Sequence, residues 1–114
     1  MDRPSPRMNP LLGRWRITTA ELWRDKDLDV AQGARVEFQI GSTGSIRMGS
    51  LEGEIDWRSR DSRAGWRAHF TWSGSVDGRP ASGRGWVRLV DQRRLFGKVF
   101  IHGGEDPRFR ALRI

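Results

Sequence analysis

The sequence predicts an all-β fold, an antiparallel up-and-down meander of about seven or eight short strands that forms a small closed or nearly closed barrel. Three observations predict it. Apolar and polar residues alternate with a period of two in several segments, glycine-rich turn sequences separate these segments, and several strands are apolar on one face only. A chain of 114 residues has the length of one domain and can bury one core without disulfides.

Clear alternation predicts four strands, over residues 14–19, 35–40, 51–58 and 66–72. In the first, Trp15 and Ile17 lie on one side, while arginine and threonine lie on the other. In the second, Val36, Phe38 and Ile40 are expected to face the core. Further candidate strands cover residues 45–48, 83–90, 95–102 and 109–114.

Turn sequences separate the predicted strands. Residues 41–44 (Gly-Ser-Thr-Gly) and the pair Asp77-Gly78 are typical of hairpins, because glycine accepts the positive φ that such turns need. Residues 60–65 and 103–107 are predicted to be longer polar loops, and 91–94 a short turn. Glycines within the strands, such as Gly85 and Gly97, indicate bulges or tight bends.

One segment lacks alternation and is predicted to form a short helix or an ordered loop after the first strand. It covers Ala20–Val30 and contains Leu22, Trp23 and Leu28, which could close one end of a barrel. Before the first strand, residues 1–10 hold three prolines and are predicted to be a flexible tail, so that 11–114 form the single barrel domain.

The composition excludes some classes of site. Without cysteine there are no disulfides and no thiolate metal sites. No apolar run is typical of a signal peptide or a membrane span, so a cytoplasmic location is expected. The net charge of +7 and the pI of about 11.4 are typical of nucleic-acid-binding chains.

The arginines also have an explanation unrelated to function. Of the 21 basic residues only Lys26 and Lys98 are lysine, a bias that a GC-rich genome produces through its codons. The arginines are spread along the whole chain and interleaved with 14 acidic residues, which is typical of a solvated surface. A nucleic-acid-binding module would use the outer strand faces that carry Arg14, Arg16, Arg47, Arg67 and Arg88.

Two strands carry apolar residues on both faces and need cover on both. The residues expected to lie under such a cover are Val87, Leu89, Phe96 and Phe100. The cover is the 20–30 segment, the chain's own tail or a second copy of the protein, and a homodimer is the expectation.

Gly13-Arg14-Trp15 forms a G-x-W on the first strand after a short extended segment. It resembles the opening signature of lipocalin-type and related calycin barrels. The resemblance implies that Trp15 packs across the barrel floor beneath an arginine of the last strand, Arg110 or Arg113. Residues 21–23, 82–86 and 102–106 also resemble a group of small uncharacterised bacterial proteins, for which no activity is implied.

No motif in the chain indicates an enzyme. Serines lie outside any nucleophile elbow, there is no Walker loop, and tyrosine is absent. His102 precedes Glu105 and Asp106 and could act as a general base, a metal ligand or a haem ligand, but a strand-end histidine bonded to a loop is commoner. Residues 25–29 have the D-x-D-x-D rhythm of a calcium loop but lack its glycine and glutamate. We therefore expect no cofactor and no metal.

Six tryptophans are the remaining feature, and four of them lie on the same face as the aliphatic residues of their strands. The first functional hypothesis is therefore a non-enzymatic barrel whose interior binds a small apolar or aromatic ligand. The residues expected to contact it are Trp15, Trp23, Trp57, Trp72, Trp86 and His102. Tryptophans that simply fill the interior are the alternative. Nucleic-acid binding is the second hypothesis, and an enzyme using His102 with Glu105 or Asp106 the third.

Overall fold

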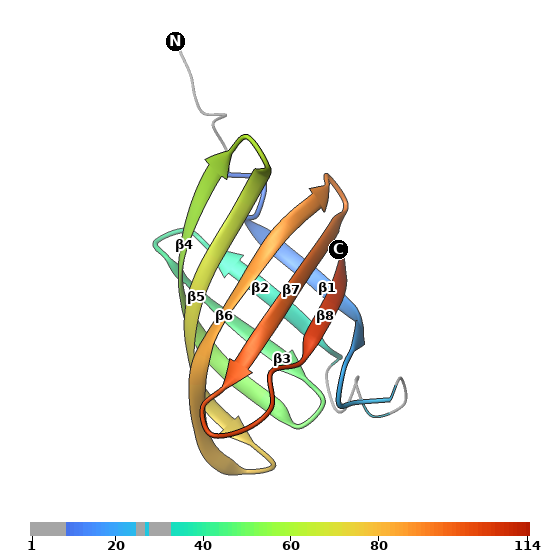
Figure 1. Ribbon diagram of the computed structural model, residues 1–114, viewed down its shortest axis with the longest axis vertical. Helices are drawn as coiled ribbons and strands as arrows, with labels where there is room; N and C mark the ends of the chain where they lie inside the picture. The colour runs from blue at the N-terminus through green and yellow to red at the C-terminus, as the bar shows by residue number, and fades with distance from the viewer. Residues whose placement is uncertain (1–8, 25–26, 28–32) are drawn as a thin grey trace.

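In the part of the chain that the structure describes, eight antiparallel strands follow one another around a closed barrel (Figure 1). The computed structural model describes residues 9–24, 27 and 33–114. The strands are β1 (Gly13–Ala20), β2 (Arg35–Gln39), β3 (Thr43–Met48), β4 (Leu51–Ser62), β5 (Gly65–Val76), β6 (Arg79–Asp91), β7 (Arg94–Ile101) and β8 (Arg108–Arg113). Each strand pairs with the next, and β1 pairs with β8 to close the sheet. The predicted meander and its closure are confirmed.

The β4–β5 hairpin is longer than alternation predicts. β4 continues to Ser62 and β5 begins at Gly65, so residues 60–65 are the tip of a hairpin, and the predicted polar loop was wrong. From Arg58 onward every side chain of β4 is exposed. Alternation cannot mark such a strand, because both of its faces lie in solvent above the barrel.

The β2–β3 connection corrects a second expectation. β2 ends at Gln39, and Ile40, predicted to face the core, is 85% exposed. The chain turns at Gly41 and Ser42, whose φ angles are 92° and 70°, and so Ile40 leaves the sheet before its side chain can point inward. By contrast, Asp77 and Gly78 form the predicted tight turn with φ angles of 53° and 75°.

The segment after β1 is described only in part. Within the predicted helix or loop over 20–30, residues 25–26 and 28–30 lie outside the described residues. Trp23 forms an isolated bridge with Ala20 and packs against the core. Within the described part of the chain, no helix has the length and apolar character needed to cross a membrane.

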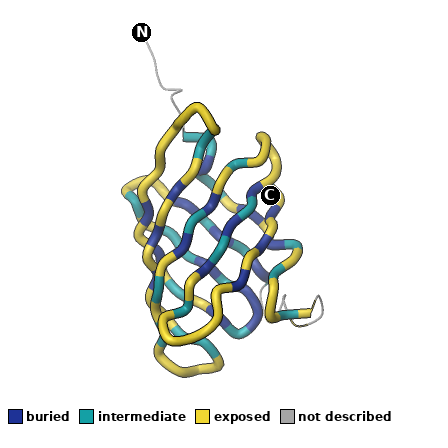
Figure 2. Tube along the Cα trace, viewed as in Figure 1, coloured by how far each residue is buried: buried dark blue, intermediate teal, exposed yellow. Residues whose placement is uncertain are grey.

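The core lies inside the barrel, and buried and exposed residues alternate along the strands (Figure 2). Trp15, Trp57 and Trp72 are 0%, 6% and 2% exposed, so their predicted inward placement is confirmed. Every buried hydrophobic residue of the described chain belongs to one cluster, in which the rings of Phe38 and Trp57 meet edge to face at 5.1 Å.

Aromatic rings lie directly against glycines of the neighbouring strands. A Cβ at Gly85 would come within 2.2 Å of Cζ of Phe70, and one at Gly97 within 2.7 Å of Cζ of Phe109. The predicted strand glycines are therefore places where a ring occupies the space of a missing side chain. Trp72 has the same relation to Gly53, at 3.0 Å. These three rings occupy the interior space beside the glycines.

Arg113, on the last strand, contacts the segment that begins the first strand. Its guanidinium carbon lies 4.1 Å from the centroid of Trp15, and its Nη1 donates to the carbonyl of Leu12 at 2.7 Å. Its Nη2 donates to the carbonyl of Pro10. Burial lowers the pKa of Arg113 from its ordinary value. Of the two arginines that the calycin resemblance offered for this position, Arg113 occupies it, and Arg110 points outward.

Candidate nucleic-acid interface

The indoles inside the barrel are held by the chain itself. Nε1 of Trp15 donates to the carbonyl of Leu11 at 3.0 Å, and Nε1 of Trp57 to that of Thr43 at 2.8 Å. Nε1 of Trp72 donates to the carbonyl of Phe100 at 3.1 Å. Because the N–H of each indole already donates to a backbone carbonyl, these side chains are core residues of the described structure.

Trp23 and Trp86 are placed differently from one another. Trp23 is half-buried and lies over Gly49, where a Cβ would come within 2.2 Å of its ring. Trp86 lies on the outer face of β6, and the predicted inward position on this strand belongs to Val87, which is 0% exposed. The expectation that Trp86 lines the interior was wrong. Inward space along β6 is occupied by Phe70 and Trp72 from β5, which lie over Gly85 and Gly83.

The same strand parity corrects the predicted dimer surface. Val87 is inside the barrel, and Leu89 is half-buried against the core, so neither needs an external cover. Phe96 and Phe100 do lie outside, and Phe100 is 37% exposed. Cover of these two phenylalanines by a second copy of the chain stays a prediction.

His102 and its neighbouring carboxylates are exposed at the β7–β8 loop. The backbone N–H of His102 donates to the carbonyl of Ser82 at 2.8 Å, and the carboxylate of Asp106 pairs with Nζ of Lys98 at 3.3 Å. The hollows described below are not lined by His102, Glu105 or Asp106. Nothing in this arrangement brings the three side chains to a common pocket.

Cations and aromatic rings are interleaved on the outer face of β5, β6, β7 and β8. Of these strands, β5, β6 and β7 cross in front in Figure 1. Cross-strand pairing arranges them in three rows, in which each residue is opposite the next. The rows are Thr71–Arg84–Phe100, His69–Trp86–Lys98–Arg108 and Arg67–Arg88–Phe96–Arg110. We call Arg67, Arg84, Trp86, Arg88, Phe96, Lys98, Phe100 and Arg110 the basic-aromatic face.

The rings of this face support the cations beside them. Trp86 and Phe96 lie 5.7 Å apart with their planes tilted by 59°. The guanidinium carbons of Arg88 and Arg110 lie 5.3 Å and 5.7 Å from the centroid of Phe96. Such cation–π contacts hold the two arginines in place without neutralising them. Phe96 is therefore the support on which two positive charges are fixed at the surface.

The charges of the basic-aromatic face are largely uncompensated. Arg67 is directly opposite Arg88 on one side and Arg60 on the other. Within the described residues no carboxylate lies within ion-pair distance of Arg67, Arg84, Arg88 or Arg110. Like charges directly opposite one another destabilise a sheet, so this arrangement is electrostatically unfavourable unless an anion binds.

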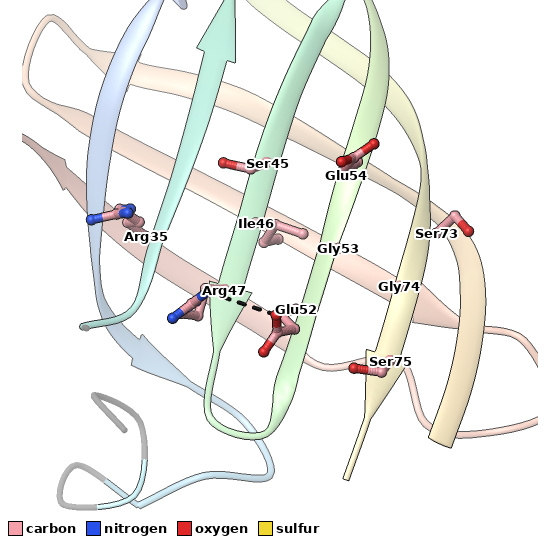
Figure 3. Close-up of a pocket in the computed structure, with 10 residues that line it drawn as sticks. All are labelled: Arg35, Ser45, Ile46, Arg47, Glu52, Gly53, Glu54, Ser73, Gly74 and Ser75. Carbon is pink, nitrogen blue, oxygen red and sulfur yellow. Dashed lines mark ion pairs between the residues drawn. The ribbon is translucent and has the colours of Figure 1, made fainter. Parts of the chain in front are cut away.

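The outer face of β2, β3 and β4 provides a contrast. It also holds an arginine pair, Arg35 opposite Arg47, but Arg47 is paired with Glu52 at 3.7 Å (Figure 3). The two arginines and Glu52 line a groove of about 380 Å³ on this face, and Glu54 and three serines line it as well. The described outward positions of these strands carry no aromatic residue. Cations without rings and with carboxylates nearby are typical of an ordinary solvated surface.

Sequence reasoning identified this face only in part. Of the five arginines proposed for nucleic acid, Arg67 and Arg88 lie on it, whereas Arg14, Arg16 and Arg47 lie on β1 and β3. The sequence pattern did not reveal the aromatic component, because it predicted Trp86 inside the barrel and Phe96 under a cover formed by the 20–30 segment, the tail or a second copy. The spacing of Arg84, Trp86 and Arg88 at alternate positions was the signal that could have shown a shared outward face.

Comparisons with known proteins give no relative for this chain: no family model matches, and neither the curated proteins nor the solved structures contain a match.

Proposed function

We propose that this protein binds nucleic acid through the basic-aromatic face. The observation that carries the proposal is the row Arg67–Arg88–Phe96–Arg110, in which three arginines and a ring lie side by side across four strands. Clustered cations bind phosphates, and exposed aromatic rings stack on unpaired bases. Cations and rings lie together on this face. The net charge of +7 adds a long-range attraction to any polyanion.

The rigid sheet adds to this function. Side chains on strands are positioned more accurately than side chains on loops, and the guanidinium groups of Arg88 and Arg110 are further supported by Phe96. A phosphate placed between Arg67 and Arg88 would relieve their mutual repulsion. Less ordering of the protein is then required when the ligand binds, which favours affinity.

Fluorescence anisotropy with labelled single-stranded and double-stranded oligonucleotides at low and moderate salt tests the proposal. We expect binding that weakens steeply as salt rises, with a slope of roughly −0.7 per phosphate contacted on a single strand. The variant Arg67→Ser/Arg88→Ser should lose at least about tenfold in affinity. It should also lose roughly two phosphate contacts from the slope.

The matched control is Arg14→Ser/Arg35→Ser, which removes the same charge from the outer face of β1 and β2. If affinity came only from net charge, the two double variants would weaken binding equally. Equal weakening, or no binding of either oligonucleotide at low salt, would contradict the proposed function.

A second candidate is a calycin-like barrel that holds a small apolar or aromatic ligand, and it is favoured by the three tryptophans that face the interior, Trp15, Trp57 and Trp72. Fluorescence quenching across a library of hydrophobic ligands tests it. If no ligand of the library quenches the tryptophan fluorescence, this second candidate is wrong.

A further inference from the structure

Trp86 stands between two hollows on the basic-aromatic face. The larger hollow, of about 560 Å³, is lined by Trp86, Arg84 and Phe100, and also by the ion pair of Asp56 with Arg58. The smaller, of about 310 Å³, is lined by Trp86, Arg67 and Arg88. His69, directly opposite Trp86 on β5, borders both. Trp86 therefore lines both hollows, and its ring also contacts Phe96.

The spacing along β6 suits flat rings. Arg84, Trp86 and Arg88 are two residues apart, and the strand rise places such neighbours about 6.8 Å from one another. Stacked bases are about 3.4 Å apart, so this Cα spacing is that of two side chains with one base between them. Guanidinium planes and indole faces are both surfaces on which a base stacks.

A double helix cannot use this arrangement, because its bases are already stacked on one another and present only their edges in the grooves. Its phosphates could still contact the arginines. A single strand, by contrast, can place a base in each hollow while its phosphates follow Arg67, Arg88 and Arg110.

We infer that Trp86 inserts between two neighbouring unpaired bases, one in each hollow, and that the protein thereby prefers single strands over duplexes. This inference rests on the proposed function and specifies its ligand. The bases are expected to stack against Arg84 on one side and Arg88 on the other. No hydrogen bond to a base edge is invoked, so the inferred stacking tolerates different base sequences.

Three probes of equal length test the inference: an oligothymidine of twelve nucleotides, an abasic strand with the same phosphates and a duplex of twelve base pairs. Wild-type protein should bind the oligothymidine at least about fivefold more tightly than either of the others. Trp86→Leu should lose this advantage and leave affinity for the abasic strand unchanged. Trp86→Phe, which keeps a ring, should retain most of the advantage.

Fluorescence supplies a second readout. Trp86 lines both hollows, whereas Trp15, Trp57 and Trp72 are buried. The half-buried Trp23 and Trp66 line neither hollow. Oligothymidine should therefore quench emission of the wild-type protein, and the quenching should disappear in Trp86→Phe. The abasic strand should quench neither protein.

The outcomes separate the inference from the proposed function. If Trp86→Leu binds oligothymidine as tightly as the wild type while Arg67→Ser/Arg88→Ser does not, the surface binds phosphates and the stacking inference is wrong. Equal affinity for single strand and duplex overturns it as well. If none of the three probes binds at low salt, both the inference and the proposed function fail.

Discussion

Arg67 and Arg88 lie directly opposite one another on the outer face of β5 and β6. Proteins usually place opposite charges at such positions, because a like-charged pair costs free energy of folding. No ion pair of the described residues compensates either arginine. In the proposed function, a phosphate bound between the two arginines offsets this cost.

The first prediction separates stability from binding at this pair. Arg67→Ser should raise the free energy of unfolding at low salt, by on the order of 0.5 kcal/mol, because it removes repulsion from Arg88 and Arg60. The same substitution should weaken oligonucleotide binding. Urea denaturation and anisotropy measure the two effects, and the gain in stability should shrink in high salt. A variant that is less stable than the wild type would show that the repulsion is unimportant.

A second prediction concerns the contact between Gly85 and Phe70. Gly85→Ala would place a Cβ 2.2 Å from the ring and 2.8 Å from the carbonyl oxygen of Lys98, so it should destabilise the barrel by about 1–3 kcal/mol. Urea denaturation measures the loss. Adding Phe70→Leu should cost less in this background than in the wild type, because the two sites share the same space.

Gly104→Ala is the control for Gly85→Ala. A Cβ at Gly104, in an exposed loop, would have Cγ2 of Ile101 as its nearest neighbour, at 3.2 Å, and the carbonyl oxygen of Ile101 at 3.7 Å. Its effect on the urea midpoint should be small. Equal losses for the two alanine variants would mean that the ring does not occupy the space beside Gly85.

The third prediction compares Arg113 with Arg110 on the same strand. Arg113→Lys should destabilise the barrel by about 1–3 kcal/mol, because one ammonium group cannot serve the carbonyls of both Leu12 and Pro10 and also cover Trp15. Arg110→Lys, on the outer face, should leave stability nearly unchanged. Urea denaturation followed by near-ultraviolet circular dichroism checks both variants. A larger loss for Arg110→Lys would contradict the assigned roles.

The fourth prediction is a pH dependence at Glu21. Hydrogen bonds from Arg108, at 2.8 Å to its side chain and 2.9 Å to its backbone N–H, hold the pKa of Glu21 below its usual value of 4.5. A carboxylate with a lowered folded-state pKa stabilises the protein above pH 4.5, and this contribution is lost as pH falls through the folded-state pKa. Glu21→Gln should therefore lower the melting temperature at pH 7 and have progressively less effect in acid.

Glu105→Gln is the matched control for this ion pair. Glu105 is exposed, and among the described residues its carboxylate forms no ion pair. The melting temperature of this variant should follow that of the wild type at every pH. A Glu21→Gln variant whose deficit is as large in acid as at neutral pH would show that packing, and not the charge pair, is lost.

The strand pairing explains why the barrel was predictable and its binding face was not. Counting outward from the Asp77-Gly78 turn places Arg67 opposite Arg88 and His69 opposite Trp86, so this register is implicit in the sequence. The β6–β7 register is not, because a bulge between Leu89 and Asp91 shifts the pairing by one residue. Without the bulge, Arg88 would not be opposite Phe96.

The sequence also did not show which side chains of β6 point into the barrel, and this again depends on a neighbouring strand. Sequence reasoning assigned large apolar residues to the interior, yet Gly85 faces inward and Trp86 outward on the same strand. Space inside is filled from β5 by Phe70, a long-range relation that no pattern within β6 reveals. Trp15, on a strand with ordinary alternation, was placed correctly.

The pairing of β1 with β8 has a consequence for biosynthesis. The first strand has one neighbour as soon as β2 is made, but its other edge stays open until the residues around Arg113 have left the ribosome. Pairing between such distant segments is slow, and an open strand edge can join another chain in the meantime. Nascent or truncated chains that lack β8 are therefore the species most exposed to aggregation.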